Sequence, residues 1–382
     1  MKKAVFYSIL VFYLFLLWYS CVYLGFSIVD VKGIERFRFL EIFFHYLFSI
    51  DKNDCLLRLP GVTLSLINIA LFYKLSGFYL KKEKDKLFAV LIFAFLPANI
   101  ISAVVINKAV YIIFLTLLFI YLHYKNRYVS FIYLSFLVFI DYSFISLFFG
   151  LIFYAIYKKD NLLLILSLIF LALNANYFHY DIGGKPSGHF LDVFGIYFLI
   201  FSPFVFIYFL YALYKGVLDK KKDVMFFISF YAFLISILLS FRQHIRIEDY
   251  APFSVFYVMY MVRYYLHSYR VRLKPFRKFY KLLFAVLLGS LLIFDVLLFV
   301  NTHTPAKKLT ENYYVIKPMI KLLRKEKIDN LYSNNRYLME VLKFYGFKEG
   351  KSFYIDYNKK NISILHKNRI ILRIDVSKLN TI

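Results

Sequence analysis

The chain has 382 residues, of which 61% are hydrophobic and 22% aromatic, and 48 Lys and Arg against 23 Asp and Glu give it a net charge of +25. Soluble domains have no core large enough to bury so much apolar surface, so this composition excludes a soluble globular enzyme. Nucleic-acid binding, which the charge would suggest in a soluble protein, is disfavoured because the aromatic residues lie in apolar stretches rather than in a basic groove.

Apolar stretches recur along the first 300 residues, many of them near the length needed to cross a hydrocarbon core of about 30 Å. We therefore predict an all-α polytopic membrane protein, a helical bundle of about eleven spans. The predicted spans are 4–28, 60–80, 87–106, 109–123, 129–141, 143–157, 162–176, 192–214, 223–241, 251–267 and 280–300. The short fifth and sixth spans also fit a re-entrant or kinked pair inside the bundle.

Basic residues predict the orientation of these spans. Five loops rich in Lys and Arg, at 81–86, 125–127, 158–159, 220–222 and 270–281, fall on one side of the membrane. By the positive-inside rule that side is cytoplasmic, so we expect a multi-pass protein of the plasma (inner) membrane with a cytoplasmic N-terminus. The other side then receives the loops 29–59, 177–191 and 242–250, the turn Asn107-Lys108, the bend near Asp141 and the tail.

The division into domains follows from the spans. Residues 1–300 form the predicted transmembrane domain, and 301–382 a small extracytoplasmic α/β domain. In the first outer loop, 29–59, residues 34–49 are amphipathic, which predicts a helix lying in the membrane interface. Its apolar face is Phe37, Leu40, Phe44, Leu47 and Phe48, and its polar face is Glu35, Arg38, Glu41, His45 and Ser49.

The tail shows helical and strand patterns in turn. Apolar residues recur at helical spacing from Val315 to Lys327, a short strand follows at 331–332, and a second helix starts at Arg336 and ends before Gly346. Alternation predicts strands at 353–357, 362–365 and 369–374. We see no catalytic arrangement in this domain and expect it to be structural or to help cover a substrate.

The outer side carries the candidate chemical groups. Asp30 lies at the end of the first span, where a partly desolvated carboxylate can serve as a general base or simply end a helix. The segment 242–249 is the densest polar cluster, and its arginines either bind a lipid phosphate or pair with neighbouring carboxylates. Lys108 either contacts a phosphate or snorkels to the interface. The two cysteines are uninformative: Cys21 lies in a span and Cys55 in a polar loop, so no disulfide framework is implied.

The order of these features resembles the GT-C membrane glycosyltransferases, and within them the protein O-mannosyltransferase and aminoarabinose-transferase-like group. Leu57-Arg58-Leu59-Pro60 resembles that group's Arg-Leu-Pro signature. A third span with Pro97 midway, a short outer turn and an aromatic-rich fourth span follow in the same order. The segment Arg246-Ile247-Glu248-Asp249-Tyr250-Ala251-Pro252 is similar to its late Arg-x-Tyr-x-x-Pro region. The resemblance covers roughly residues 1–300.

This resemblance implies an inverting transfer of a sugar from a polyprenyl-phosphate donor to an acceptor on the extracytoplasmic side. Asp30 takes the position of the catalytic base in this comparison. The residues expected to bind substrate are Glu35, Arg58, Lys108, His244, Arg246 and Asp249. The expected partners are membrane lipid, the lipid-linked donor and an acceptor that is a protein, lipid or glycan.

Two positions depart from the family pattern. Asp30-Val31 stands where the family usually has Asp-Glu, and Asn107-Lys108 replaces a turn that usually carries an acidic residue. We therefore predict no metal ligand, although a divalent metal stays open as a cofactor. The alternatives to an enzyme are a lipid-linked-sugar transporter or flippase, and a catalytically silent scaffold of the same fold.

Overall fold

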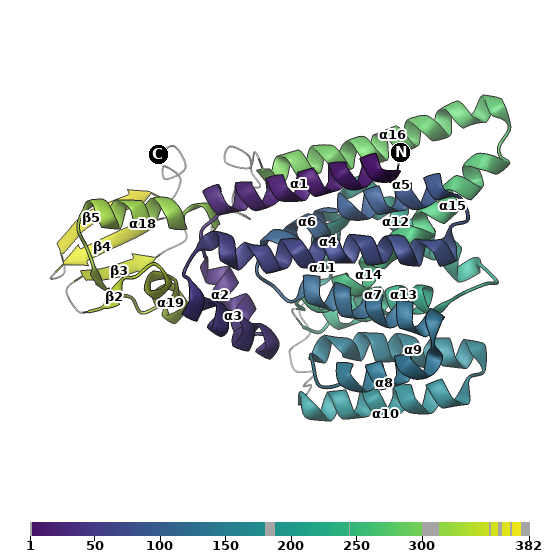
Figure 1. Cartoon of the computed structure of the whole chain (residues 1–382), viewed down its shortest axis with the longest axis horizontal. Coiled ribbons are helices and arrows are strands. Elements are labelled where there is room, and N and C mark those ends of the chain that lie inside the picture. Colours follow the sequence, from purple (N-terminus) through teal and green to yellow (C-terminus); the bar gives the residue numbers. More distant parts are fainter. Residues whose placement is uncertain are drawn as a thin grey trace. The chain divides into compact units, whose positions relative to one another are not determined.

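The computed structural model describes residues 2–179, 188–243, 245–299, 313–350, 353–357, 361–366 and 369–375 (Figure 1). The described residues are mostly helical, as predicted, and their strands all lie in the C-terminal tail. The chain forms two compact units. Unit 1 comprises Met1–Leu10, Thr63–Ala103 and Lys108–Val296, and unit 2 comprises Val11–Val62, Val104–Asn107 and Leu297–Ile382. The whole of the predicted first outer loop, 29–59, therefore belongs to the same unit as the tail.

The first half of the chain follows the predicted apolar stretches. Its helices are α1 (Lys2–Tyr23), α2 (Ile28–Glu35), α3 (Arg38–Ile50), α4 (Asp54–Tyr79), α5 (Glu83–Ala94), α6 (Pro97–Val104), α7 (Ala109–Lys125), α8 (Arg127–Leu137), η1 (Tyr142–Phe144), α9 (Ile145–Lys158) and α10 (Asn161–Tyr177). The predicted span 87–106 is broken between α5 and α6, which are bent by 55°. Pro97 explains the break, because its ring fits the first position of a helix but not the interior.

The second half contains another broken span. The helices are α11 (Phe190–Phe201), α12 (Pro203–Leu218), α13 (Val224–Ser240), η2 (Ile247–Asp249), α14 (Ala251–Ser254), η3 (Val255–Tyr257), α15 (Val258–Val271) and α16 (Lys274–Phe299). The predicted span 192–214 is split into α11 and α12, bent by 106°. At the break Ser202 has a φ of 67°, outside the helical region, and Pro203 begins the next helix.

The helix lengths bear on the membrane prediction. Among the described residues, three helices are long and apolar enough to cross a membrane, α1, α4 and α16, and the number rises to five if each bent pair counts as one span. Several of the other predicted spans coincide with apolar helices of 10–17 residues. The structure is therefore compatible with a membrane protein, and the number of eleven spans stays a prediction.

Close helix contacts build the core of unit 1. A Cβ atom placed on Gly150 of α9 would lie 3.0 Å from the Cα atom of Ile228 in α13, so glycine allows these two backbones to approach. Beside them, α14, η3 and the first five residues of α15, 258–262, are all buried. An aromatic cluster completes the core, with the rings of Phe209 and Phe233 5.3 Å apart.

In unit 2 the amphipathic segment forms α3, and the predicted helix over 34–49 is interrupted. Phe37 is extended, with φ −129° and ψ 100°, and separates α3 from the shorter α2. Leu40 and Phe44 are buried, as expected for the apolar face. Tyr46 and Ile42, however, are 66% and 67% exposed, so α3 also has an apolar face that the protein leaves open.

The tail has the predicted α/β pattern. Its helices are α18 (Ile316–Lys325) and α19 (Arg336–Phe344), and its strands are β1 (Asn330–Tyr332), β2 (Lys348–Glu349), β3 (Phe353–Tyr357), β4 (Asn361–His366) and β5 (Arg369–Asp375). The sheet order is β2-β1-β3-β4-β5, parallel from β2 to β3 and antiparallel from β3 to β5. Helix α19 supplies the crossover that parallel neighbours require. Gly346 has a φ of 92°, which confirms its position after the helix.

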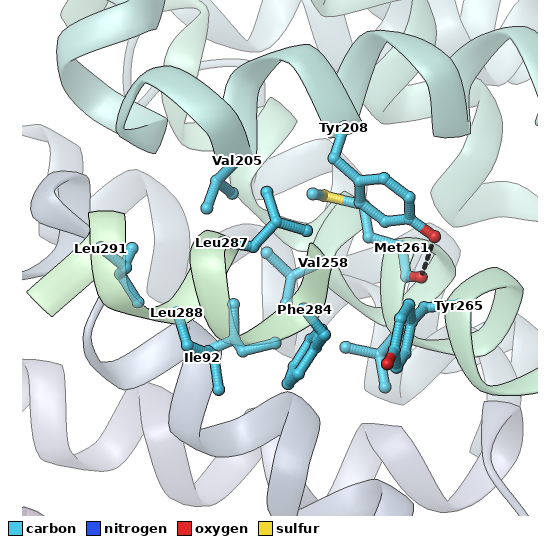
Figure 2. A pocket seen from close by; sticks show the side chains of 11 residues that line it. Ile92, Val205, Tyr208, Val258, Met261, Tyr265, Phe284, Leu287, Leu288 and Leu291 are labelled. Atoms are coloured by element: carbon cyan, nitrogen blue, oxygen red, sulfur yellow. Dashed lines mark hydrogen bonds between the residues drawn. The ribbon is translucent and has the colours of Figure 1, made fainter. Parts of the chain in front are cut away.

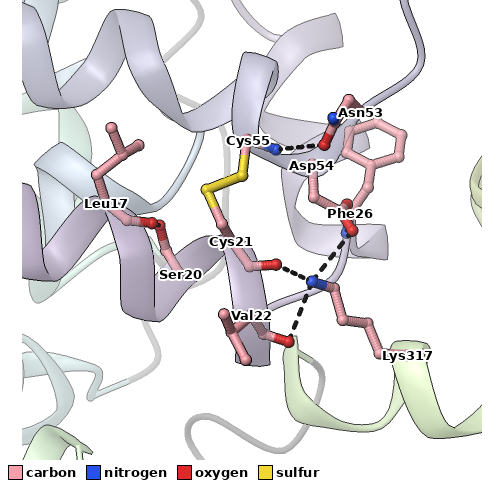
Figure 3. The surroundings of a disulfide bond; sticks show 9 residues. All are labelled: Leu17, Ser20, Cys21, Val22, Phe26, Asn53, Asp54, Cys55 and Lys317. Carbon is pink, nitrogen blue, oxygen red and sulfur yellow. Dashed lines mark hydrogen bonds and ion pairs between the residues drawn. A yellow bond between two sulfur atoms is a disulfide. The ribbon is translucent and has the colours of Figure 1, made fainter.

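A disulfide joins Cys21 and Cys55, with their Cα atoms 4.8 Å apart (Figure 3). The positions of these two cysteines in the sequence did not imply this bond. Cys21 lies near the C-terminal end of α1 and Cys55 in the first turn of α4, so the bond ties the first helix to the fourth. Spacing within the sequence does not show this, because only the packing of α1 against α4 brings the two thiols together.

Candidate functional site

Asp30 is held by the start of its own helix. Ser27 is the N-cap of α2, its hydroxyl accepts a hydrogen bond from the backbone N–H of Asp30, and the Asp30 carboxylate accepts one from the backbone N–H of Ser27 at 3.0 Å. This reciprocal capping box satisfies two helix-end groups. It also fixes the carboxylate in the interior of unit 2, where Asp30 is fully buried.

Arg58 of α4 forms a buried, two-pronged ion pair with Asp30. Its terminal nitrogens lie 2.9 and 2.8 Å from the two carboxylate oxygens of Asp30, and Arg58 is 1% exposed. The same nitrogens donate to the backbone carbonyls of Val104 at 2.9 Å and Gly25 at 3.0 Å. Such a geometry is the strong form of a guanidinium–carboxylate contact.

The Asp30 carboxylate accepts five hydrogen bonds: two from Arg58, two from the backbone and hydroxyl of Ser27, and one at 3.0 Å from the backbone N–H of Ile106. A carboxylate has about four lone-pair positions, so its acceptor capacity is full. Gly33 lets the Ile106 backbone come this close, because a Cβ atom at Gly33 would overlap the Ile106 carbonyl. In this arrangement the two oxygens of Asp30 hold Arg58 rather than stand free as a base.

Unit 1 contains a second buried charge group, the lysine cluster, made of Lys108, Asp141, Tyr142 and Asp249. The Lys108 ammonium lies 2.8 Å from an oxygen of Asp141 and 2.6 Å from an oxygen of Asp249. It also lies 3.9 Å from the centre of the Tyr142 ring, in cation–π geometry. The Tyr142 hydroxyl donates to the second oxygen of Asp249 at 2.5 Å.

The elements that carry the lysine cluster are short turns. Lys108 directly precedes α7, Asp141 caps η1 by accepting from the backbone N–H of Ser143 at 2.9 Å, and Asp249 ends η2. All three charged residues are at most 4% exposed. Sequence reasoning located Asp141 at a polar bend but missed its role and that of Tyr142. The signal was an isolated carboxylate between two apolar stretches.

The charges of the lysine cluster do not cancel if every group is ionised, because one ammonium faces two carboxylates. Burial raises the pKa of Asp249 above its ordinary value of 3.8, although Lys108 and the Tyr142 hydroxyl oppose the shift. Burial by itself lowers the pKa of Lys108, but the two carboxylates more than compensate and the net pKa is raised. We conclude that Lys108 stays charged and that Asp249 takes up a proton more readily than a carboxyl group in water does.

The remaining predicted residues lie elsewhere. Glu35, at the end of α2, forms an ion pair with Arg336 at 3.0 Å, and the Arg336 side chain is 78% exposed. Arg246 is exposed, and its guanidinium makes no ion pair with any residue that the structure describes. His244 lies outside the described residues. The structure thus joins Asp30 to Arg58 and Lys108 to Asp249, each pair within its own unit. Among the described residues, no ion pair joins the side chain of Glu35 or of Arg246 to these groups.

Two further features concern metal ligands and cavities. No group of three or more His, Cys, Asp or Glu side chains that could hold a metal ion occurs in the described part of the chain. A cavity in unit 1 is lined by apolar side chains of α5, α12, α15 and α16 (Figure 2). Its Tyr208 hydroxyl donates to the backbone carbonyl of Met261 at 3.2 Å, and none of the predicted site residues lines it.

Comparisons of the chain with protein-family models, with curated proteins and with solved structures found no match.

Proposed function

We propose that the protein is a membrane glycosyltransferase that moves a sugar from a polyprenyl-phosphate donor to an acceptor on the extracytoplasmic side. The supporting observation is that residues selected from the sequence meet in pairs. Asp30 and Arg58 are 28 positions apart, yet they form a buried bidentate contact. Lys108 and Asp249 likewise meet in the lysine cluster. Buried, paired charges in an apolar helical protein are by default candidates for function.

In the proposed reaction an acceptor hydroxyl oxygen attacks the anomeric carbon of the sugar, and the bond from that carbon to the phosphate oxygen breaks. The polyprenyl phosphate leaves with the bonding electron pair, and Asp30 takes the acceptor proton. Because Arg58 occupies both oxygens of Asp30 in the described state, the base must first be released. A donor phosphate offers Arg58 an equivalent anionic partner, and exchange of that partner would free a carboxylate oxygen.

The orientation proposed from the charge pattern has independent support. Disulfides persist in oxidising compartments and are rare in the cytosol. The Cys21–Cys55 bond lies at the end of α1 opposite to the N-terminus, on the side that the positive-inside rule assigns to the outside. Labelling with a membrane-impermeant thiol reagent after mild reduction tests the assignment, because both thiols should react in intact cells only from outside.

The second candidate function is a catalytically silent scaffold of the same class. One observation favours it: Asp30 and Lys108, two of the residues expected to act on substrate, are saturated by partners inside the protein. Fully paired buried charges are what a structural role requires. The two candidates differ in whether any lipid-linked sugar is consumed.

The test is a transfer assay with the purified full-length protein in lipid vesicles. The probes are polyprenyl-phosphate-linked hexoses and pentoses with a radiolabelled sugar, and the readouts are released polyprenyl phosphate and labelled acceptor from cell-envelope extracts. Loss of a general base should lower the rate by about 10²–10⁴ in Asp30→Asn, whereas the exposed Asp51→Asn should match the wild type. If the wild type consumes no donor, the scaffold is favoured. If Asp30→Asn transfers sugar at an undiminished rate, Asp30 is not the general base.

A further inference from the structure

The tail is bonded to the first outer loop by a buried tyrosine. Tyr345 is the C-cap residue of α19. Its hydroxyl accepts a hydrogen bond from the backbone N–H of Phe26 at 2.8 Å and donates one to a carboxylate oxygen of Asp54 at 2.8 Å. The Phe26 N–H also lies 3.1 Å from the same oxygen. Burial raises the pKa of Tyr345, so the hydroxyl keeps the proton that it donates. One hydroxyl thus connects the loop, the start of α4 and the tail.

The surroundings of Tyr345 are packed closely enough to hold this geometry. A Cβ atom on Gly25 would lie 3.0 Å from the Tyr345 hydroxyl and 3.1 Å from Ile316, so a larger residue here would crowd the contact between the loop and the tail. The Gly25 N–H donates to the carbonyl of Tyr313 at 3.2 Å. The ring of Phe344 lies 4.7 Å from that of Phe26.

Lys317 of α18 makes a second connection beside the disulfide (Figure 3). Its ammonium pairs with Asp54 at 3.3 Å and donates to the carbonyls of Cys21 and, at 3.2 Å, Val22. These carbonyls lie at the C-terminal end of α1, where a cation is favourable because the helix dipole is negative there. The tail therefore contacts both helices that the disulfide joins.

The loop that Tyr345 holds is the one that supports the Asp30–Arg58 pair. The residue before Phe26, Gly25, gives its carbonyl to Arg58 at 3.0 Å. The residue after it, Ser27, donates to Asp30 from its backbone and its hydroxyl, both at 3.0 Å. A displacement of Phe26 must therefore move a partner of each member of the ion pair.

We propose that Tyr345 is a positioning residue for the Asp30–Arg58 site, and that the tail acts on the site through the loop residues 24–27. The tail is then a component of the site rather than only a cover over it. The catalytic consequence rests on the proposed function, whereas the structural consequence does not. For this reason the experiment has one readout for each.

The test compares Tyr345→Phe with Tyr332→Phe in the full-length protein in vesicles. Tyr332 is a matched control because it lies in the same domain, on β1, and its side chain is 41% exposed. The first readout is hydrogen–deuterium exchange in the peptides that cover 24–30 and 336–345. Loss of a hydroxyl that bonds a carboxylate should speed exchange at 24–30 about tenfold. Exchange within α19 should stay unchanged, because the helix keeps its own hydrogen bonds.

The second readout is the transfer rate. Tyr345→Phe should lower kcat more than it raises KM, because the variant displaces the loop that orients Asp30 but keeps the Arg58 guanidinium that the proposal assigns to the donor phosphate. Unchanged exchange at 24–30, or faster exchange spread over α19 as well, would overturn the proposal, because the tyrosine would then only stabilise the tail. Faster local exchange without any transfer by the wild type would uphold the positioning role and reject the glycosyltransferase. If Tyr345→Phe does not fold, Lys317→Gln replaces it, because Lys317 forms an ion pair with the same Asp54 carboxylate. This variant must also speed hydrogen–deuterium exchange at 24–30 and leave exchange within α19 unchanged.

Discussion

Breaking the Asp30–Arg58 pair should destabilise unit 2 strongly, because either partner alone is a buried charge. The guanidinium of Arg58 is 1% exposed, and in Asp30→Asn it would lose its only carboxylate contact among the described residues. Removing one member of a buried ion pair typically costs about 3–5 kcal/mol. At about 2–4 °C per kcal/mol, the thermal midpoint should fall by roughly 6–20 °C.

The assay is a double-mutant cycle with Asp30→Asn, Arg58→Met and the two combined, each purified in the same detergent. Thermal unfolding is followed by circular dichroism, and Asp51→Asn on the exposed end of α3 serves as the control. The combined variant leaves no unpaired charge. Its loss of unfolding free energy should therefore be smaller than the sum of the losses in the two single variants by about 1–3 kcal/mol. Additive effects, or single shifts no larger than that of the control, would refute the argument that this pair organises the loop.

Three other predictions concern stability. Asp249 has a raised pKa in the folded protein, so its contribution to the free energy of unfolding is present below pH 3.8 and is lost as the pH rises through the raised pKa. Asp249→Asn should therefore flatten the fall of the thermal midpoint above pH 4. If the thermal midpoints of the wild type and the variant fall with the same slope against pH, the prediction is contradicted. Replacing Cys21 and Cys55 with serine removes a crosslink between residues 34 positions apart. The free energy of unfolding measured by chemical denaturation should fall by about 3–4 kcal/mol, and a reductant should not change the stability of the variant. Gly33→Ala should lower the thermal midpoint through its overlap with a backbone carbonyl, whereas Gly289→Ala, which meets nothing within 4 Å, should leave it unchanged or raise it.

Local patterns in the sequence determined the secondary structure of this protein. Runs of apolar side chains make helices favourable in any apolar solvent, because a helix satisfies its own backbone hydrogen bonds. Apolar residues at helical spacing and alternating apolar residues likewise predicted the helices and strands of the tail, including Gly346 after α19. The breaks before Pro97 and Pro203 have an equally local cause, although the continuous apolar stretch hid them.

The sites were decided by the tertiary structure, because their members are far apart in the sequence. Arg58 and Asp30 are separated by 28 residues, Ile106 and Asp30 by 76, and Tyr142 and Asp249 by 107. The sequence supplied most of these residues as candidates, since a charged group at the end of an apolar stretch is conspicuous. It did not supply their partners. Which carboxylate neutralises which cation, and whether two thiols meet, depends on how the helices pack, and no periodicity of side chains within one helix records that packing.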